Sequence, residues 1–198
     1  MRYLNLVRNF LNIFDYFQQK KILNFFKDYF EKDIIFFDIG AHHGESIKIF
    51  SNNFNLKEIH CFEPSPYNFE ILSKNIKKYN FKINVNLNNI GVGSEKKSVF
   101  LNQTEESSSS TINTFNKNSN YLKKKLKILN INNLKEYYKK ISINLISLDE
   151  YIEKNNINEI DIIKIDTEGF EFDVIKGLSL KNKLIKFIYF EHHYDDMI

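Results

Sequence analysis

The chain has 198 residues, of which 42% are hydrophobic and 15% aromatic, and its formal net charge is +3. This length suits one domain with a single core, and the apolar content excludes global disorder. Basic residues are scattered apart from the run at 123–125, so the sequence does not indicate nucleic-acid binding.

The first 33 residues are predicted to be a helical extension ahead of the main domain at 34–198. Apolar residues recur at helical spacing between Leu4 and Phe17, so this helix would either dock on the domain or make weak peripheral membrane contact through residues 1–30. No apolar run reaches the roughly 18 residues of a membrane span, and no signal-peptide core is present. We therefore expect a cytoplasmic protein without a transmembrane segment.

Short apolar runs and amphipathic stretches alternate along the rest of the chain. Strands are expected at 34–40, 58–62, 83–89, 99–101, 141–148, 160–166 and 185–190. Helices are expected at 45–53, from Pro66 onward, in a basic stretch ending at 140, from Asp149 onward and at 170–175. Strands that alternate with helices indicate an α/β fold, a mostly parallel sheet with helices on both faces.

Residues 102–121 are rich in Ser, Thr and Asn and are predicted to form a long surface loop. Long loops in compact domains often act as lids over a site. The serine run at 107–110 is therefore interpreted either as part of a lid that contacts substrate or as a plain flexible loop. The one cysteine, Cys61, is interpreted as a buried small hydrophobe.

Polar residues follow the predicted strands at their carboxyl ends, where open α/β sheets bind ligands. Gly40 and Gly44 in the first such connection permit close backbone approach of a nucleotide-like ligand, although a tight strand-helix connection would look the same. Glu63, after the second strand, can accept two hydrogen bonds from a ribose diol. The glycine spacing G-x-x-x-G matches neither the dinucleotide fingerprint nor the P-loop, which disfavours NAD and ATP.

Together these segments resemble the FkbM-type methyltransferases. The matching segments, in chain order, are 37–44, 62–66, 91–93, 107–110, 147–149, 164–171 and Gly177. The resemblance covers about 34–193 and implies a Rossmann-like class I methyltransferase fold with S-adenosylmethionine as the methyl donor. It further implies O-methylation of a sugar or other natural-product hydroxyl, so that the partner is a small-molecule or glycan acceptor.

The resemblance also implies roles for individual residues. The cofactor-binding set comprises Asp38, Gly40, Ala41, His42 and Gly44 around the methionine part, Glu63 on the ribose, and Asn89, Gly91 and Val92 near the adenine. Asp166 and Glu168 would face the transferred methyl group. The family commonly has asparagine where His42 stands, so the hydrogen bonds in the methionine pocket are expected to differ here.

Methyl transfer to a hydroxyl needs an aligned acceptor and a base. Asp166 is the first candidate for the base and Glu168 the second, although either could instead cap the helix that follows. Glu191 and His192 follow the last predicted strand and either reach the same mouth of the sheet or belong to a solvated terminus. We expect no metal site, because Asp166, Glu191 and a histidine lack a recognised metal-binding spacing.

A class I fold normally ends with two more strands than the sequence provides. The final strands are therefore expected to be absent, or the domain to be truncated at its C-terminus, and an unpaired sheet edge would favour a homo-oligomer. The alternative function is a degenerate S-adenosylmethionine-binding module without independent activity.

Overall fold

The computed structural model describes residues 20–179 and 184–190. Its first sheet has five strands in the order β3-β2-β1-β7-β8, and each neighbouring pair is parallel. The bounds are β1 Ile34–Ile39, β2 Leu56–Phe62, β3 Asn84–Asn88, β7 Ile160–Ile165 and β8 Ile185–Phe190. All five strands were predicted from the sequence, and the mostly parallel sheet is confirmed.

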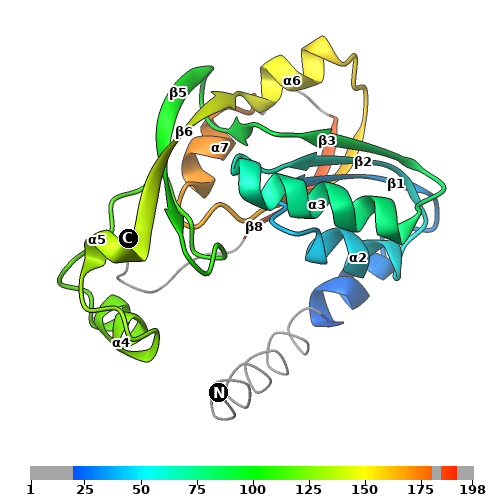
Figure 1. Cartoon of the computed structure of the whole chain (residues 1–198). Coiled ribbons are helices and arrows are strands. Elements are labelled where there is room, and N and C mark those ends of the chain that lie inside the picture. The colour runs from blue at the N-terminus through cyan, green and yellow to red at the C-terminus, as the bar shows by residue number, and fades with distance from the viewer. Residues whose placement is uncertain (1–19, 180–183, 191–198) are drawn as a thin grey trace.

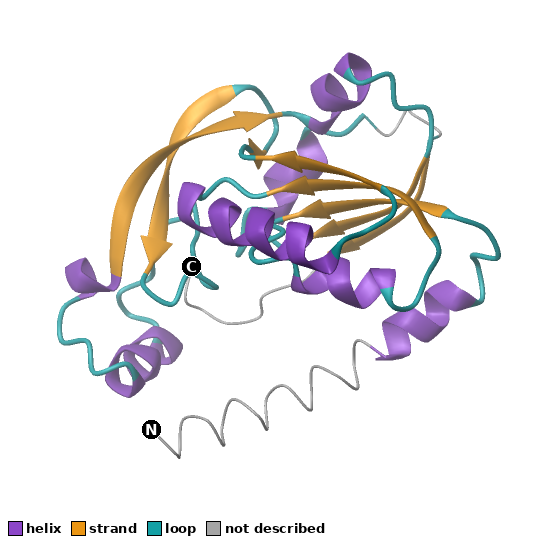
Figure 2. Ribbon diagram, turned by 45° about the vertical axis from the view of Figure 1, so that its right-hand side comes forward, coloured by secondary structure: helices purple, strands orange, loops and turns teal. Residues whose placement is uncertain are grey.

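Helices cover both faces of this sheet (Figure 1 and Figure 2). These are α2 Glu45–Ser51 and α3 Pro66–Tyr79 on one face and α6 Leu148–Lys154 and α7 Glu171–Lys176 on the other. The helices α4 Asn120–Ile128 and α5 Leu134–Tyr137 lie away from this sheet. Side chains of the fully buried β1 alternate between two cores. Phe37 packs with residues of α6 and α7, whereas Phe36 packs with residues of α2 and α3.

Residues 20–27 form a further helix that docks on the sheet. Its Leu23 and Phe26 are buried in the same core as Phe36 and the α2 residue Phe50. The docking alternative therefore holds for this part of the predicted extension. Residues 1–19 lie outside the described residues. The predicted membrane contact through residues 1–30 falls largely on them. Within the described part of the chain, no helix is long and apolar enough to cross a membrane.

A second, three-stranded sheet has the order β4-β6-β5 and was not predicted. Its bounds are β4 Gly91–Val92, β5 Lys97–Thr104 and β6 Tyr138–Ile146. β4 pairs with β6 in parallel, and β5 pairs with β6 antiparallel. The β5–β6 pair curves away from the first sheet toward α4 and α5 (Figure 1). The basic stretch expected to stay helical to Lys140 therefore ends earlier, because its last residues extend β6.

The surface loop expected at 102–121 is shorter and more buried than its composition suggested. It begins after Thr104 and ends at Ser119, whose hydroxyl accepts a hydrogen bond from the α4 residue Leu122. Thr111 is fully buried, and its backbone pairs with that of Asn102. Burial of polar side chains is tolerated here because several of them, such as Thr111 and Ser110, hydrogen-bond to the protein itself rather than to water.

Candidate active site

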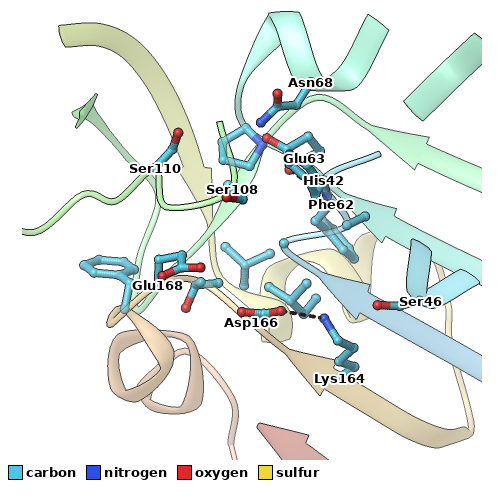
Figure 3. Close-up of a pocket in the computed structure, with 18 of the residues that line it drawn as sticks. His42, Ser46, Phe62, Glu63, Asn68, Ser108, Ser110, Lys164, Asp166 and Glu168 are labelled. Atoms are coloured by element: carbon cyan, nitrogen blue, oxygen red, sulfur yellow. Dashed lines mark hydrogen bonds and ion pairs between the residues drawn. The ribbon is translucent and has the colours of Figure 1, made fainter. Parts of the chain in front are cut away.

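A cavity of about 320 Å³ opens at the carboxyl ends of β1, β2 and β7 (Figure 3). Its walls come from the turns after these three strands, from β4 and from the serine loop, residues 105–119. This is the edge at which parallel α/β sheets bind ligands. The predicted position of the site and the observed cavity therefore coincide.

The turn after β1 is held against its two neighbouring strands by backbone contacts. The amides of Gly40 and Ala41 both donate to the Phe62 carbonyl, at 2.9 and 3.0 Å, and the Asp166 amide donates to the Ile39 carbonyl at 2.9 Å. Gly40 has φ +84°, and a Cβ added there would lie 1.8 Å from the Asp166 carbonyl oxygen. Only glycine therefore fits at this position without a backbone shift.

Glu63 follows β2 and presents a buried carboxylate to the cavity. Oε2 accepts from the His42 amide and Oε1 from the Ser65 amide, each at 2.9 Å. Burial raises the pKa of Glu63 to about 7, although these two amides oppose the shift. The nearby Asn68 is also buried and lines the cavity, and its Oδ1 has no hydrogen-bond partner among the described residues.

Lys164 lies between two carboxylates at the end of β7. Its Nζ is 3.0 Å from Asp166 Oδ2 and 3.6 Å from Asp38 Oδ1. Burial disfavours the charged lysine, yet the two carboxylates raise the pKa of Lys164 above its usual value. Asp38 is fully buried, and burial raises its pKa to about 6 despite the opposing effect of Lys164. The ammonium group thus fixes the position of the Asp166 carboxylate at the cavity.

The turn after β7 is held by Glu171, the first residue of α7. Glu171 Oε1 accepts from the Thr167 amide at 2.9 Å, the Thr167 hydroxyl at 3.1 Å and the Gly169 amide at 3.1 Å. Glu168, inside this turn, has φ 52° and its carbonyl accepts a 2.7 Å hydrogen bond from the Thr111 hydroxyl. The turn is therefore fixed both by its own helix and by the serine loop.

The serine loop contributes Ser107, Ser108 and Ser110 to the cavity wall. His42 Nε2 and Ser107 Oγ are 2.8 Å apart, which links the serine loop to the turn after β1. Ser110 Oγ donates to the Ser107 carbonyl at 2.8 Å. These hydrogen bonds hold the serine run at the cavity wall, and its contact with substrate stays a prediction.

The cavity is lined by most, but not all, of the predicted site residues. Those that line it are Gly40, Ala41, His42, Glu63, Gly91, Val92, Asp166 and Glu168. Asp38 lies behind the cavity as the partner of Lys164, and Gly44 is the N-cap residue of α2 and does not line the cavity. Asn89 donates to the Glu63 carbonyl at 2.8 Å and thereby supports the turn after β2 instead. Glu191 and His192 lie outside the described residues.

Several lining residues were missed by the sequence reasoning, above all Asn68 and Lys164. Lys164 stands in the segment that carried the family resemblance, so a signal for it was present. Asn68 lies in the first turn of α3 and is only 2% exposed. Its sequence context contains no comparable signal, because an asparagine near a helix start is usually a surface residue.

Comparisons with known proteins identify the family of the chain. The model of the methyltransferase FkbM domain matches residues 38–197, and no curated protein matches the chain. The crystal structure of methyltransferase FkbM from Methylobacillus flagellatus KT is similar, with 19% sequence identity and a TM-score of 0.46. The match covers 73% of this chain and 28% of that one, so the chain spans little more than a quarter of the length of that relative. By the match over residues 38–197, the chain belongs to the FkbM methyltransferase family.

Proposed function

We propose that the chain is an S-adenosylmethionine-dependent methyltransferase that acts on a hydroxyl group of a sugar or another natural product. Family membership supports methyl transfer. The observation that carries the cofactor assignment is the buried Glu63 carboxylate, which faces the cavity beside the turn that contains Gly40.

The residues present fit such a cofactor. A cavity of about 320 Å³ lies within the range of roughly 300–1,000 Å³ that is usual for small-molecule sites. Each Glu63 oxygen accepts one backbone amide and retains a lone pair for a ribose hydroxyl. The unpartnered Asn68 Oδ1 offers a further buried acceptor at the same wall.

S-adenosylmethionine, when bound, supplies an electrophilic methyl group. The acidic residues at the cavity would orient the acceptor hydroxyl and take its proton. Figure 3 shows Glu63, His42 and Asn68 at one side of the cavity and Asp166 and Glu168 at the other. In this proposal Asp166 accepts the proton of the acceptor hydroxyl. Lys164 holds the Asp166 carboxylate in place through their 3.0 Å ion pair.

The cofactor assignment is tested by replacing Glu63 with glutamine. We expect S-adenosylmethionine to bind the unmodified chain and to bind Glu63→Gln at least about tenfold more weakly, because the amide offers one acceptor oxygen instead of two. Titration calorimetry measures both affinities, and NAD serves as the nucleotide that should not bind.

Glu70→Gln is the matched control, since Glu70 lies on α3 with an exposed side chain paired to Lys74. Equal affinities of Glu63→Gln and Glu70→Gln would refute the ribose role of Glu63. Cofactor binding without turnover over a broad panel of acceptors would instead support the degenerate binding module.

The affinity for S-adenosylmethionine is also expected to depend on pH. Burial raises the pKa of Glu63 to about 7, and only the ionised carboxylate accepts from both ribose hydroxyls. Because the protonated fraction grows as the pH falls through 7, the dissociation constant should rise about tenfold from pH 8 to pH 6. Calorimetry at three pH values measures this, and Glu63→Gln should remove the dependence. A pH-independent affinity in the unmodified chain would contradict the prediction.

A further inference from the structure

The turn between β1 and α2 brings together His42, His43 and Glu45, which the proposed methyl transfer does not use as a group. One ligand atom from each residue lies within 4.8 Å of the other two. The Nδ1 atoms of His42 and His43 lie 3.4 and 3.8 Å from the same oxygen, Oε1 of Glu45. We propose that these three side chains bind a divalent transition-metal ion of the Zn²⁺ type at the wall of the cavity.

The observed spacing is close to that of a metal site. Two imidazole nitrogens and a carboxylate oxygen form a common ligand set for zinc, with bonds of about 2.0–2.2 Å. In a tetrahedral site of that size, neighbouring ligand atoms are about 3.4 Å apart. The two distances to Glu45 Oε1 are 3.4 and 3.8 Å, and all three ligand atoms lie within 4.8 Å of one another, so side-chain rotations that include unstacking of the two rings would bring the three atoms onto one ion.

The second nitrogen of the His42 ring supports the same assignment. Nε2 of His42 lies 2.8 Å from Ser107 Oγ, and a proton on Nε2 that is donated to this hydroxyl leaves a lone pair on Nδ1. Metal-binding histidines usually donate their other ring N–H in this way, which fixes the tautomer and the ring orientation. The rings of His42 and His43 stack, with centroids 3.7 Å apart and planes inclined by 20°, so one ring must turn for both Nδ1 lone pairs to point at the same ion.

The charges around the three side chains are compatible with a bound cation. Within the described ranges, Glu45 forms ion pairs only with His42 and His43, so no lysine or arginine neutralises it there. His42 and Glu45 also line the cavity. Three protein ligands leave the fourth tetrahedral position open, as in catalytic zinc sites. The expectation of no metal considered only Asp166, Glu191 and a histidine, and it overlooked the H-H-x-E pattern at 42–45.

The site is tested by titrating Zn²⁺ into the chelator-treated full chain, without S-adenosylmethionine, so that the result is independent of the proposed function. We expect one ion per chain, and at least tenfold weaker binding for His43→Asn and for Glu45→Gln. The Glu45 side chain is 61% exposed, so Glu45→Gln should fold even if His43→Asn does not. Circular dichroism checks the fold of each variant.

A double variant, His192→Asn with His193→Asn, is the matched control, because these two residues form the other histidine pair of the chain. It should bind Zn²⁺ as the unmodified chain does. The visible absorption of bound Co²⁺ provides a second readout of nitrogen and oxygen coordination. The proposal is overturned if the unmodified chain binds no Zn²⁺, if Glu45→Gln binds it as tightly, or if only the His192 and His193 variant loses it.

Discussion

Replacing Gly40 with alanine is expected to lower the free energy of unfolding by at least about 3 kcal/mol. The backbone at Gly40 has φ +84°, and the new Cβ would stand 1.8 Å from the Asp166 carbonyl oxygen. That oxygen belongs to the first backbone residue after β7, and the amide of the same residue donates a hydrogen bond to the Ile39 carbonyl. Neither β1 nor β7 can move away from this clash without losing strand pairing in the centre of the sheet. Urea unfolding followed by circular dichroism measures the loss.

Gly44→Ala is the matched control, because it imposes the same kind of backbone strain without a backbone clash. Gly44 has φ +91°, and its added Cβ would meet only side-chain ends, of which the nearest is Leu72 Cδ1 at 3.0 Å. This variant should therefore cost about 1 kcal/mol, chiefly from the positive φ. Similar losses for the two variants would show that the contact between Gly40 and Asp166 is not the cause.

Asp166→Asn is expected to reduce methyl transfer by about 10²–10⁴-fold, which is the usual contribution of a general base. The amide keeps the shape of the carboxylate but cannot take a proton from the acceptor. The affinity for S-adenosylmethionine should stay within about threefold, because Glu63 and Asn68 lie at the other side of the cavity. Transfer of a labelled methyl group to a panel of sugars, alongside calorimetry of the cofactor, separates the two effects.

Glu168→Gln tests the second candidate for the base in the same assay. Lys164 forms an ion pair with Asp166, whereas the backbone of Glu168 is held by Thr111. We therefore expect the larger loss from Asp166→Asn. A tenfold or smaller loss in Asp166→Asn together with a large loss in Glu168→Gln would exchange the two roles.

Most strands of the first sheet could be predicted because they are short apolar runs, whereas β3 alternates asparagine with apolar residues. Strands buried on both faces consist of nearly continuous hydrophobic residues, and β1 is buried at all six positions. In the second sheet, β5 and β6 correspond to the strands expected at 99–101 and 141–148, whereas β4 was missed because it has only two residues and carries no periodic signal. It is defined by its pairing with β6, and pairing between distant segments leaves little trace in the local sequence.

The site was predicted where motifs follow strand ends, as at Gly40, Glu63 and Asp166. The role of Lys164 was missed for a different reason. Its neighbour Asp38 stands directly opposite on β1, and only the register of the two strands shows that the charges meet. The buried Asn68 likewise depends on how α3 packs, which residue type alone does not indicate.

The pairing of β1 with β7 also determines when, during synthesis, the site can form. The β1 residue Ile35 donates a 2.8 Å hydrogen bond to Asp161 on β7, and the two residues are 126 positions apart. β1, β2 and β3 therefore leave the ribosome long before β7, the second partner of β1, exists, and contacts over such separations form slowly. During that interval the open edge of β1 can pair with other chains. Protection by chaperones should accordingly matter most between the synthesis of β3 and that of β7.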